Sequence, residues 1–248
     1  MTMDRRGFLI AMASSAVAAS PTAVSIGPAL AQAGKIKPNE RSALIVVDVQ
    51  NCFVPGGSLA VKQGDEIVPL INKIAKGFEN VVMTQDWHTP GHISFASAHA
   101  GKKPFEQIQL PYGKQTLWPD HALQETANAA LHPGLAQARI EVVVRKGFHP
   151  HTDSYSAFFE NDRATVTGLD GWLRARGFRR LFLCGLATDF CVAWSAADAV
   201  RLGYQTYLIE DASRGIGLPA GEGQTTLDGA RTRLAAMGVT FVRAADLG

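Results

Sequence analysis

Short apolar runs alternate along this chain with segments whose apolar residues recur at helical spacing. The run 42–48 reads Ser-Ala-Leu-Ile-Val-Val-Asp and is typical of a strand that is buried on both faces. Between residues 67 and 74 the apolar positions have the spacing of an amphipathic helix, which Gly77 is expected to end. The same patterns predict further strands at 81–84, 140–145, 180–184, 205–209 and 239–242, and further helices at 169–176, 189–202 and 228–237.

This alternation predicts a single α/β domain. Strands that alternate with helices favour right-handed crossovers, which build a parallel sheet. We therefore expect a doubly wound fold with a six-stranded, mainly parallel sheet and helices on both faces. The segment 85–139 breaks the alternation, because it is rich in Pro, Gly and Gln and is longer than an ordinary loop. It holds five of the seven histidines, which makes it a candidate for function.

Composition and charge favour a small-molecule partner. The chain has 248 residues, of which 46% are hydrophobic, so it can bury a sizeable core. Its net charge is +2, with acidic and basic residues interspersed. Nothing in this pattern indicates nucleic acid or an anionic membrane as a partner.

Residues 1–33 are expected to be an export signal rather than part of the fold. Arg5 and Arg6 are followed by Gly-Phe-Leu and an apolar stretch rich in Ala and Ser, and 31–33 read Ala-Gln-Ala, a typical cleavage site. This pattern is typical of the twin-arginine pathway and predicts a periplasmic or exported protein. The alternative is an uncleaved anchor, but the apolar part falls short of the ~20 residues that a span requires. The folded domain is then 34–248, with no membrane anchor after signal removal.

A cysteine is expected in the first turn of one helix. Residues 180–184 form an apolar strand, Gly185 a turn, and a helix follows in which Thr188 would be the N-cap and Cys191 the N3 residue. The helix dipole there would lower the pKa of the thiol below its free value of about 8.5. The alternative is a buried cysteine with a purely structural role.

Several chemically active side chains follow directly after the expected strands. Ligands bind at the carboxyl ends of the strands in an open parallel sheet, so Asp48, Lys146 and Cys191 are expected to meet there. A carboxylate, an ammonium and a thiol together can perform acyl transfer. Taken singly, Asp48 could cap a helix and Lys146 could lie in a solvated turn.

A metal site is also indicated in this region. Asp86 and His88 stand at i and i+2, so in an extended segment their side chains point the same way. His92, His99 and His121 lie downstream. Carboxylate and imidazole ligands suit Zn²⁺, Fe²⁺ or Mn²⁺, and the ligand types alone do not distinguish these ions. The alternative is that these histidines are ordinary surface residues without a metal.

Five longer motifs occur in a fixed order between residue 41 and the end of the chain. Together they resemble the nicotinamidases, the metal-containing amidases of the isochorismatase-like cysteine hydrolases. The motifs are ALIVVDVQNCFVPGGSLAV (43–61), TQDWHTPGHISFA (84–96), LWPDHAL (117–123), RKGFHPHTDSYSAF (145–158) and CGLATDFCV (184–192).

The resemblance implies a role for each residue of the expected site. It implies Cys191 as nucleophile, Asp48 as proton acceptor and Lys146 as its cationic partner. It also implies a cis Leu186–Ala187 peptide bond, with the N–H groups of Ala187 and Cys191 turned toward an oxyanion. One divalent metal ion would be held by Asp86, His88 and His121, with His92 a ligand in only some members, and Phe53, Leu59, Trp118 and Tyr155 would line the ring pocket.

The activity that the resemblance implies is hydrolysis of nicotinamide to nicotinate and ammonia through a thioester, a step of pyridine nucleotide salvage. Pyrazinamide would also be accepted. The alternatives are a sibling amidase that acts on another small amide or carbamoyl compound, and an exported binding protein that has lost turnover. A homo-oligomer is compatible with the sequence.

Two features depart from the family. Cys52 stands where many relatives carry Asp, and we expect an accidental thiol at the mouth of the site that is open to oxidation. The export signal is unusual for a family that is mostly cytoplasmic.

Overall fold

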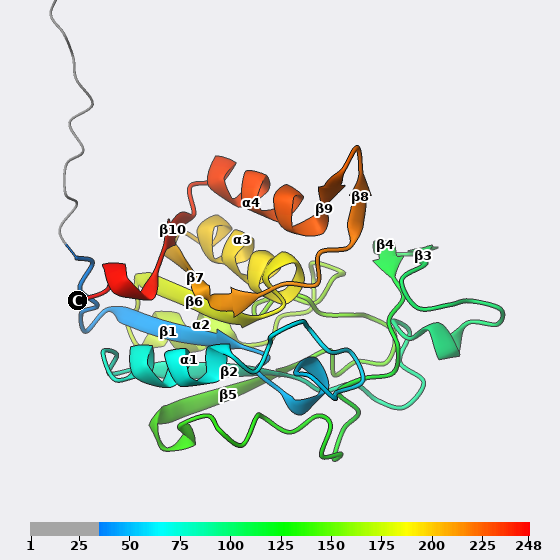
Figure 1. Ribbon diagram of the computed structural model, residues 1–248, viewed down its shortest axis with the longest axis horizontal. Coiled ribbons are helices and arrows are strands. Elements are labelled where there is room, and N and C mark those ends of the chain that lie inside the picture. Colours follow the sequence, from blue (N-terminus) through cyan, green and yellow to red (C-terminus); the bar gives the residue numbers. More distant parts are fainter. Residues whose placement is uncertain (1–34) are drawn as a thin grey trace, which may run out of the picture. The chain divides into compact units, whose positions relative to one another are not determined.

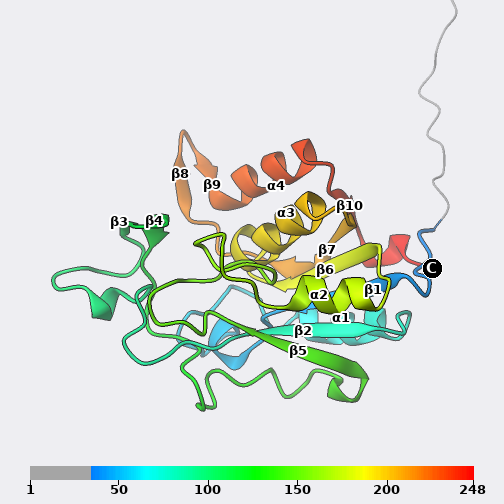
Figure 2. The same ribbon diagram turned by 180° about the vertical axis from the view of Figure 1, so that it is seen from behind.

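A six-stranded sheet forms the centre of the molecule (Figures 1 and 2). The computed structural model describes residues 35–248, so the expected export signal, residues 1–33, lies outside the described residues. All neighbouring strands of the sheet are parallel. In spatial order the strands are β10 (Thr240–Val242), β7 (Gln205–Arg214), β6 (Arg180–Leu186), β1 (Ser42–Val47), β2 (Val81–Asp86) and β5 (Ile140–Lys146).

Helices cover both faces of this sheet. Alternate residues of β1 belong to different cores: Leu44 and Val46 pack with helix α1, whereas Ala43 and Ile45 pack with the other helices. A strand that is buried on both faces has this arrangement, which explains its continuous apolar run. The helices are α1 (Ile67–Ala75) on one face and α2 (Leu169–Ala175), α3 (Ala193–Arg201) and α4 (Thr226–Ala236) on the other.

The expected fold is confirmed, and the main additions lie outside the six strands. The segment 85–139 contains an antiparallel hairpin of β3 (Gln107–Leu110) and β4 (Gly113–Thr116), and a second hairpin joins β8 (Pro219–Gly221) to β9 (Gln224–Thr225). Their sequences are polar or short, so no apolar pattern marked them as strands. Single 3-10 turns lie at Asn51–Phe53, Ala96–Ala98, Gln137–Arg139 and Ala244–Asp246. No helix between residues 35 and 248 is long and apolar enough to cross a membrane.

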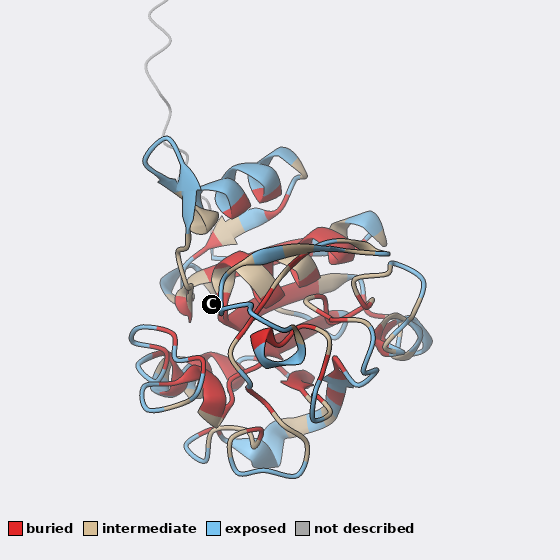
Figure 3. Ribbon diagram, turned by 90° about the vertical axis from the view of Figure 1, so that its right-hand side faces the viewer, coloured by how far each residue is buried: buried red, intermediate tan, exposed pale blue. Residues whose placement is uncertain are grey.

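At the carboxyl edge of the sheet, β6 lies close against the backbone of β1 at Gly185. Gly185 has φ +120°, a conformation that other residues rarely adopt, and an added Cβ would lie 2.1 Å from the carbonyl oxygen of Val47. Glycine is therefore required for β6 to lie against β1 where β1 ends. Figure 3 looks onto this edge and shows buried segments surrounded by exposed loops.

Gly185→Ala is expected to lower the free energy of unfolding by about 3 kcal/mol or more, because the methyl group overlaps the β1 backbone and φ is unfavourable. Gly171 is the matched control: it lies inside α2 with open space around it, so Gly171→Ala should stabilise the protein by about 0.5–1 kcal/mol. Urea unfolding of both variants measures the difference. Equal stabilities would show that the contact between β1 and β6 tolerates a side chain.

Candidate active site

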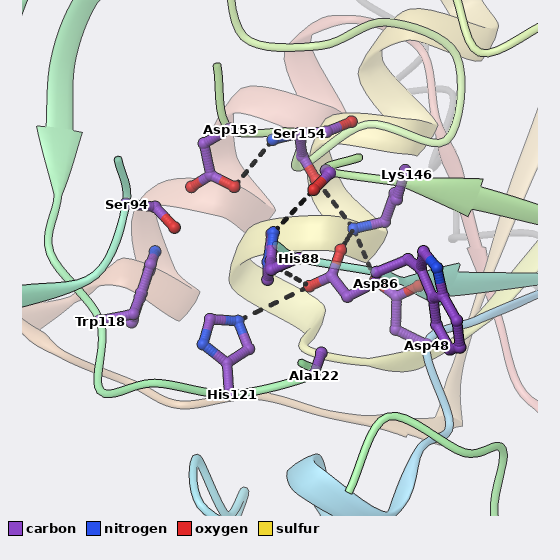
Figure 4. A network of polar contacts seen from close by, with 12 residues as sticks. Asp48, Asp86, His88, Ser94, Trp118, His121, Ala122, Lys146, Asp153 and Ser154 are labelled. Atoms are coloured by element: carbon purple, nitrogen blue, oxygen red, sulfur yellow. Dashed lines mark hydrogen bonds and ion pairs between the residues drawn. The ribbon is translucent and has the colours of Figure 1, made fainter. Parts of the chain in front are cut away.

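Asp48, Lys146 and Cys191 meet in one buried cluster at the carboxyl edge of the sheet. The Lys146 ammonium lies 2.8 Å from Asp48 Oδ2 and 3.3 Å from the Cys191 sulfur, and its side chain is fully buried. It also donates to the carbonyl oxygen of Ser154 at 2.8 Å and to Asp86 Oδ1 (Figure 4). The three residues that sequence reasoning brought together are therefore in contact through one ammonium group.

Thr84 on β2 fixes the orientation of Asp48. The backbone of Asp48 leaves β1 with φ +46°, and its N–H donates to the Thr84 hydroxyl at 3.1 Å. The same hydroxyl donates to Asp48 Oδ1 at 2.5 Å. Asp48 Oδ2 faces the Lys146 ammonium, and the Asp48 carboxylate lies within 4.8 Å of the Cys191 sulfur. The Asp48 carboxylate therefore lies close to both the ammonium and the thiol.

The charges in the cluster depend on one another. Burial raises the pKa of Asp48, although the Lys146 ammonium acts against the shift. Burial alone would lower the pKa of Lys146, but the carboxylates of Asp48 and Asp86 outweigh it and hold this pKa well above its ordinary value. The lysine is therefore a stable ammonium, and Asp48 is a stronger base than an exposed aspartate.

The expected lowering of the Cys191 pKa is wrong. Burial raises the pKa of this thiol well above its usual value, and the ammonium of Lys146 only partly opposes the shift. The neighbouring carboxylates of Asp48 and Asp86 add to the rise, since they repel a thiolate. The resting thiol is therefore protonated, so a nucleophilic role would require a neighbouring base.

The turn that carries Cys191 also differs from the expected N-terminus of an α-helix. Residues Thr188–Val192 form a π-helical turn, in which the N–H of Val192 donates to the carbonyl oxygen of Ala187 at 3.1 Å, before α3 begins. Ala187, not Thr188, occupies the cap position, and no side chain caps the turn. Such wide turns recur at functional sites. The Leu186–Ala187 peptide bond before it is cis.

Asp86, His88 and His121 form a second cluster next to the first. Asp86 Oδ2 lies 3.6 Å from His88 Nε2 and 3.7 Å from His121 Nε2 (Figure 4). The Nδ1 atoms of these histidines bond to the carbonyl oxygens of Gly147 at 2.9 Å and Pro119 at 2.8 Å. Both rings therefore present Nε2 to the carboxylate, in the way that backbone carbonyls orient metal-bound histidines.

This second cluster fits a divalent cation. Two ligands at about 2.1 Å from one ion in tetrahedral geometry stand about 3.4 Å apart, close to the separations between Asp86 and the two rings. Two buried carboxylates, Asp48 and Asp86, lie beside Lys146. Burial alone would lower the pKa of His88, but the Asp86 carboxylate raises it, so this site favours positive charge of the kind that a cation would supply. Gly147 allows the close approach to His88, because an added Cβ would lie 2.4 Å from its Cε1.

The other candidate histidines have different partners. His92 is buried beside His88 and Asp153, but its Nδ1 bonds to the Ser94 hydroxyl at 2.8 Å and its Nε2 to the carbonyl oxygen of His149 at 3.0 Å. Burial lowers the pKa of His92 to about 4, so the ring is neutral. His99 bonds through Nε2 to the carbonyl oxygen of Ile93 at 2.8 Å. Both nitrogens of His92 are thus engaged by the protein.

A small pocket opens onto both clusters. The four residues expected to line it, Phe53, Leu59, Trp118 and Tyr155, all do so. The side chain of Trp118 contacts Tyr155 through a hydrogen bond of 3.2 Å from the indole N–H to the phenol oxygen. The remaining lining residues are Asp86, His121, Asp153, Ala187, Phe190, Cys191 and Ile216.

Sequence reasoning missed several of the residues that shape this site. Asp153 and Phe190 stand within the recognised motifs but were given no role, and Ile216 lies in a segment without a motif. Gln50 is fully buried and its side-chain amide exchanges two hydrogen bonds with the backbone of Asp86, at 2.8 and 2.9 Å. The position of Gln50, two residues after Asp48 at the end of a buried strand, was the sequence feature that could have indicated a role at this edge of the sheet.

Cys52 does not lie at the mouth of the site. Its side chain is fully buried in the core between the sheet and α1, and burial raises the pKa of its thiol. The expectation of an accessible, oxidisable thiol is therefore wrong, because the 3-10 turn Asn51–Phe53 directs this residue inward.

Comparisons with known proteins agree on the family. A family model, the isochorismatase domain, matches residues 42–245. A nicotinamidase of Acinetobacter baylyi is 54% identical over 182 residues, which cover 73% of this chain and 85% of that enzyme. The solved structure of a nicotinamidase and pyrazinamidase of Acinetobacter baumanii is 52% identical, with a TM-score of 0.81, and the match covers 85% of this chain and 99% of that one. A pyrazinamidase of Pyrococcus horikoshii, solved in complex with zinc, is 33% identical with a TM-score of 0.65, and the match covers 82% of this chain and 99% of that one.

His121→Ala is expected to release a bound divalent ion, because Asp86 and His88 alone are too few ligands to hold one with water. Metal per chain, measured on protein purified with the ion present, should fall from near one to near zero. His99→Ala is the matched control and should keep the metal, since His99 bonds only to a backbone carbonyl. Full metal content in His121→Ala would contradict the site.

Proposed function

The chain belongs to the isochorismatase family, and from this membership and the geometry of its site we propose that it hydrolyses nicotinamide to nicotinate and ammonia. The observation that carries the proposal is the buried contact of Asp48, Lys146 and Cys191 beside an aromatic pocket. The matched relatives are nicotinamidases and pyrazinamidases, so nicotinamide and pyrazinamide are the expected substrates. A sibling amidase for another small amide or carbamoyl compound is less well supported by these relatives.

The first half of the reaction forms a thioester. Asp48 takes the thiol proton of Cys191, and the sulfur attacks the carboxamide carbon. The oxyanion that forms would be stabilised by the N–H groups of Ala187 and Cys191, two residues that line the pocket. When the tetrahedral intermediate collapses, its C–N bond breaks and the proton on Asp48 passes to the nitrogen, which leaves as ammonia.

The second half restores the free thiol. Asp48 takes a proton from a water molecule, and the resulting hydroxide attacks the thioester carbon. The carbon–sulfur bond breaks, the proton on Asp48 returns to the Cys191 sulfur, and nicotinic acid leaves, which loses its proton to solvent as nicotinate. Throughout both halves Lys146 stays an ammonium, because Asp86 remains a carboxylate beside it even while Asp48 carries a proton, and it orients Asp48.

A single divalent ion held by Asp86, His88 and His121 belongs to the proposal. The Pyrococcus pyrazinamidase binds zinc in its crystal structure, and the donor set of this chain also suits iron or manganese. When bound, the ion would anchor a ring nitrogen or ordered water and act as a Lewis acid there. The side chains of Phe53, Trp118 and Tyr155 would enclose the aromatic ring.

Cys191→Ala tests the function most simply. Release of nicotinate and ammonia should fall by about 10³-fold or more, because the nucleophile is lost, while metal content and melting temperature stay close to those of the wild type. Cys52→Ala is the matched control, since it removes a buried thiol outside the pocket and should keep most of the activity. Turnover above a tenth of wild type in Cys191→Ala would remove the cysteine-hydrolase mechanism.

Export through the twin-arginine pathway, with cleavage near residue 33, is proposed from the sequence of residues 1–33. The matched family model covers residues 42–245 and does not include this segment, which supports the proposal. The enzyme would then act in the periplasm or outside the cell.

Replacing both Arg5 and Arg6 by Lys should block export, because this pathway requires the arginine pair, and the full-length chain should accumulate in the cytoplasm as active enzyme. Cell fractionation with nicotinamidase assays and N-terminal sequencing measures this. Equal export of the double-lysine variant would assign the segment to general secretion instead.

A further inference from the structure

Asp189, two residues before the cysteine, is a buried carboxylate that takes no part in the chemistry derived above. It lies in the π-helical turn and is only 4% exposed. Its Oδ1 accepts from the N–H of Ile216 at 2.9 Å, and its Oδ2 accepts from the N–H of Gly217 at 2.9 Å and from the Thr226 hydroxyl. All three donors come from a segment that is distant in sequence.

Through Thr226, the hydrogen bonds of Asp189 extend to a third backbone amide. Its hydroxyl donates to Asp189 and accepts from the N–H of Leu218 at 2.9 Å, while its own N–H donates to the Leu218 carbonyl oxygen at 2.8 Å. The N–H groups of three successive residues, 216–218, are thus bonded to one carboxylate, two of them directly and the third through the Thr226 hydroxyl. We call this set of hydrogen bonds the clamp. Gly217 has φ +69°, which is typical of a backbone that turns consecutive N–H groups toward an anion.

The tied segment supplies one wall of the pocket. Ile216 lines the pocket together with Ala187, Phe190 and Cys191. The hairpin that follows, β8–β9, has no buried residue, so its own packing does little to hold the segment in place. Gly215 fits closely against the clamp, because an added Cβ would lie 2.9 Å from Asp189 Oδ1 and 2.4 Å from a methyl carbon of Leu227.

We propose that Asp189 is a positioning residue that fixes Ile216 as a wall of the substrate pocket. The π-helical turn Thr188–Val192 then has two roles. It positions the Cys191 thiol, and through Asp189 it holds the segment that lines the pocket beside the ring. The proposal rests on the proposed function for the identity of the substrate, but the clamp itself is defined by the contacts of Asp189.

A loosened wall has a recognisable kinetic signature. Ile216 is expected to contact the ring and not the reacting carboxamide, so its contribution is equal in the ground state and the transition state. Loss of such uniform binding raises KM and leaves kcat nearly unchanged. Damage to the fold or to the nucleophile turn would instead lower kcat or the fraction of active enzyme.

The test compares Asp189→Asn with a graded pair at Thr226. Asn keeps one acceptor oxygen and turns its NH2 toward an N–H donor, so at least one amide loses its partner. We expect KM for nicotinamide to rise about tenfold with kcat within about threefold of wild type. Thr226→Val should show a smaller rise, and Thr226→Ser, which keeps the hydroxyl, should match the wild type.

Alkylation of Cys191 by N-ethylmaleimide gives a readout that does not depend on the substrate. The thiol should react about tenfold faster in Asp189→Asn, and faster in Thr226→Val than in Thr226→Ser, because the wall opens more often. If nicotinamide is not turned over by the wild type, the proposed function fails, while the alkylation rates still test the clamp. Should Asp189→Asn not fold, the Thr226 pair decides.

Two results would overturn the proposal. The first is an unchanged KM with a lowered kcat in Asp189→Asn, which would give Asp189 a role in the nucleophile turn alone. The second is equal alkylation rates in Thr226→Val and Thr226→Ser, which would show that the hydroxyl link does not hold the wall.

Discussion

The ammonium of Lys146, buried between the carboxylates of Asp48 and Asp86, is the contact on which the rest of the site depends. A buried charge is costly unless it is paired and hydrogen-bonded, so the three side chains must stay together. They come from three neighbouring strands, β1, β2 and β5, and Asp86 stands directly beside Lys146 in the register of β2 and β5. The register of the sheet therefore sets the position of the charges.

This constraint links the thiol to the second cluster. Asp86 offers one oxygen to the ammonium and the other to His88 and His121, while the ammonium also contacts the Cys191 sulfur. The proposed nucleophile and the proposed metal ligands are therefore linked through the carboxylate of Asp86. Two close backbone approaches allow this arrangement, Gly185 against β1 and Gly147 against the His88 ring. A side chain at either glycine would therefore disturb the charged cluster around Lys146, although neither glycine belongs to that cluster.

The sequence predicted the central sheet because its signals are local. A strand buried on both faces must be continuously apolar, and the polar residues that end β1, β2 and β5 then fall at one edge. The contact between His121 and Asp86 could not be predicted from their spacing, because it depends on the path of the long loop between them. The resemblance to known amidases predicted this contact instead. The pKa of Cys191 was misjudged because the dipole of a turn is visible in sequence, whereas burial of the thiol is not. The roles of Ile216 and Asp189 could not be predicted, because they depend on contacts between segments that are distant in sequence, and no local sequence pattern marks such contacts.

The central claim is that Asp48, held by Lys146, activates a protonated Cys191 thiol. The most direct measurement is kcat/KM for nicotinamide in purified Asp48→Asn, with the alkylation rate of Cys191 followed in the same samples. The account predicts a loss of about 10³-fold or more in kcat/KM, because the thiol has no base, while the protein stays folded. A variant that keeps more than about a tenth of the wild-type kcat/KM, with its thiol alkylated at the wild-type rate, would contradict the account.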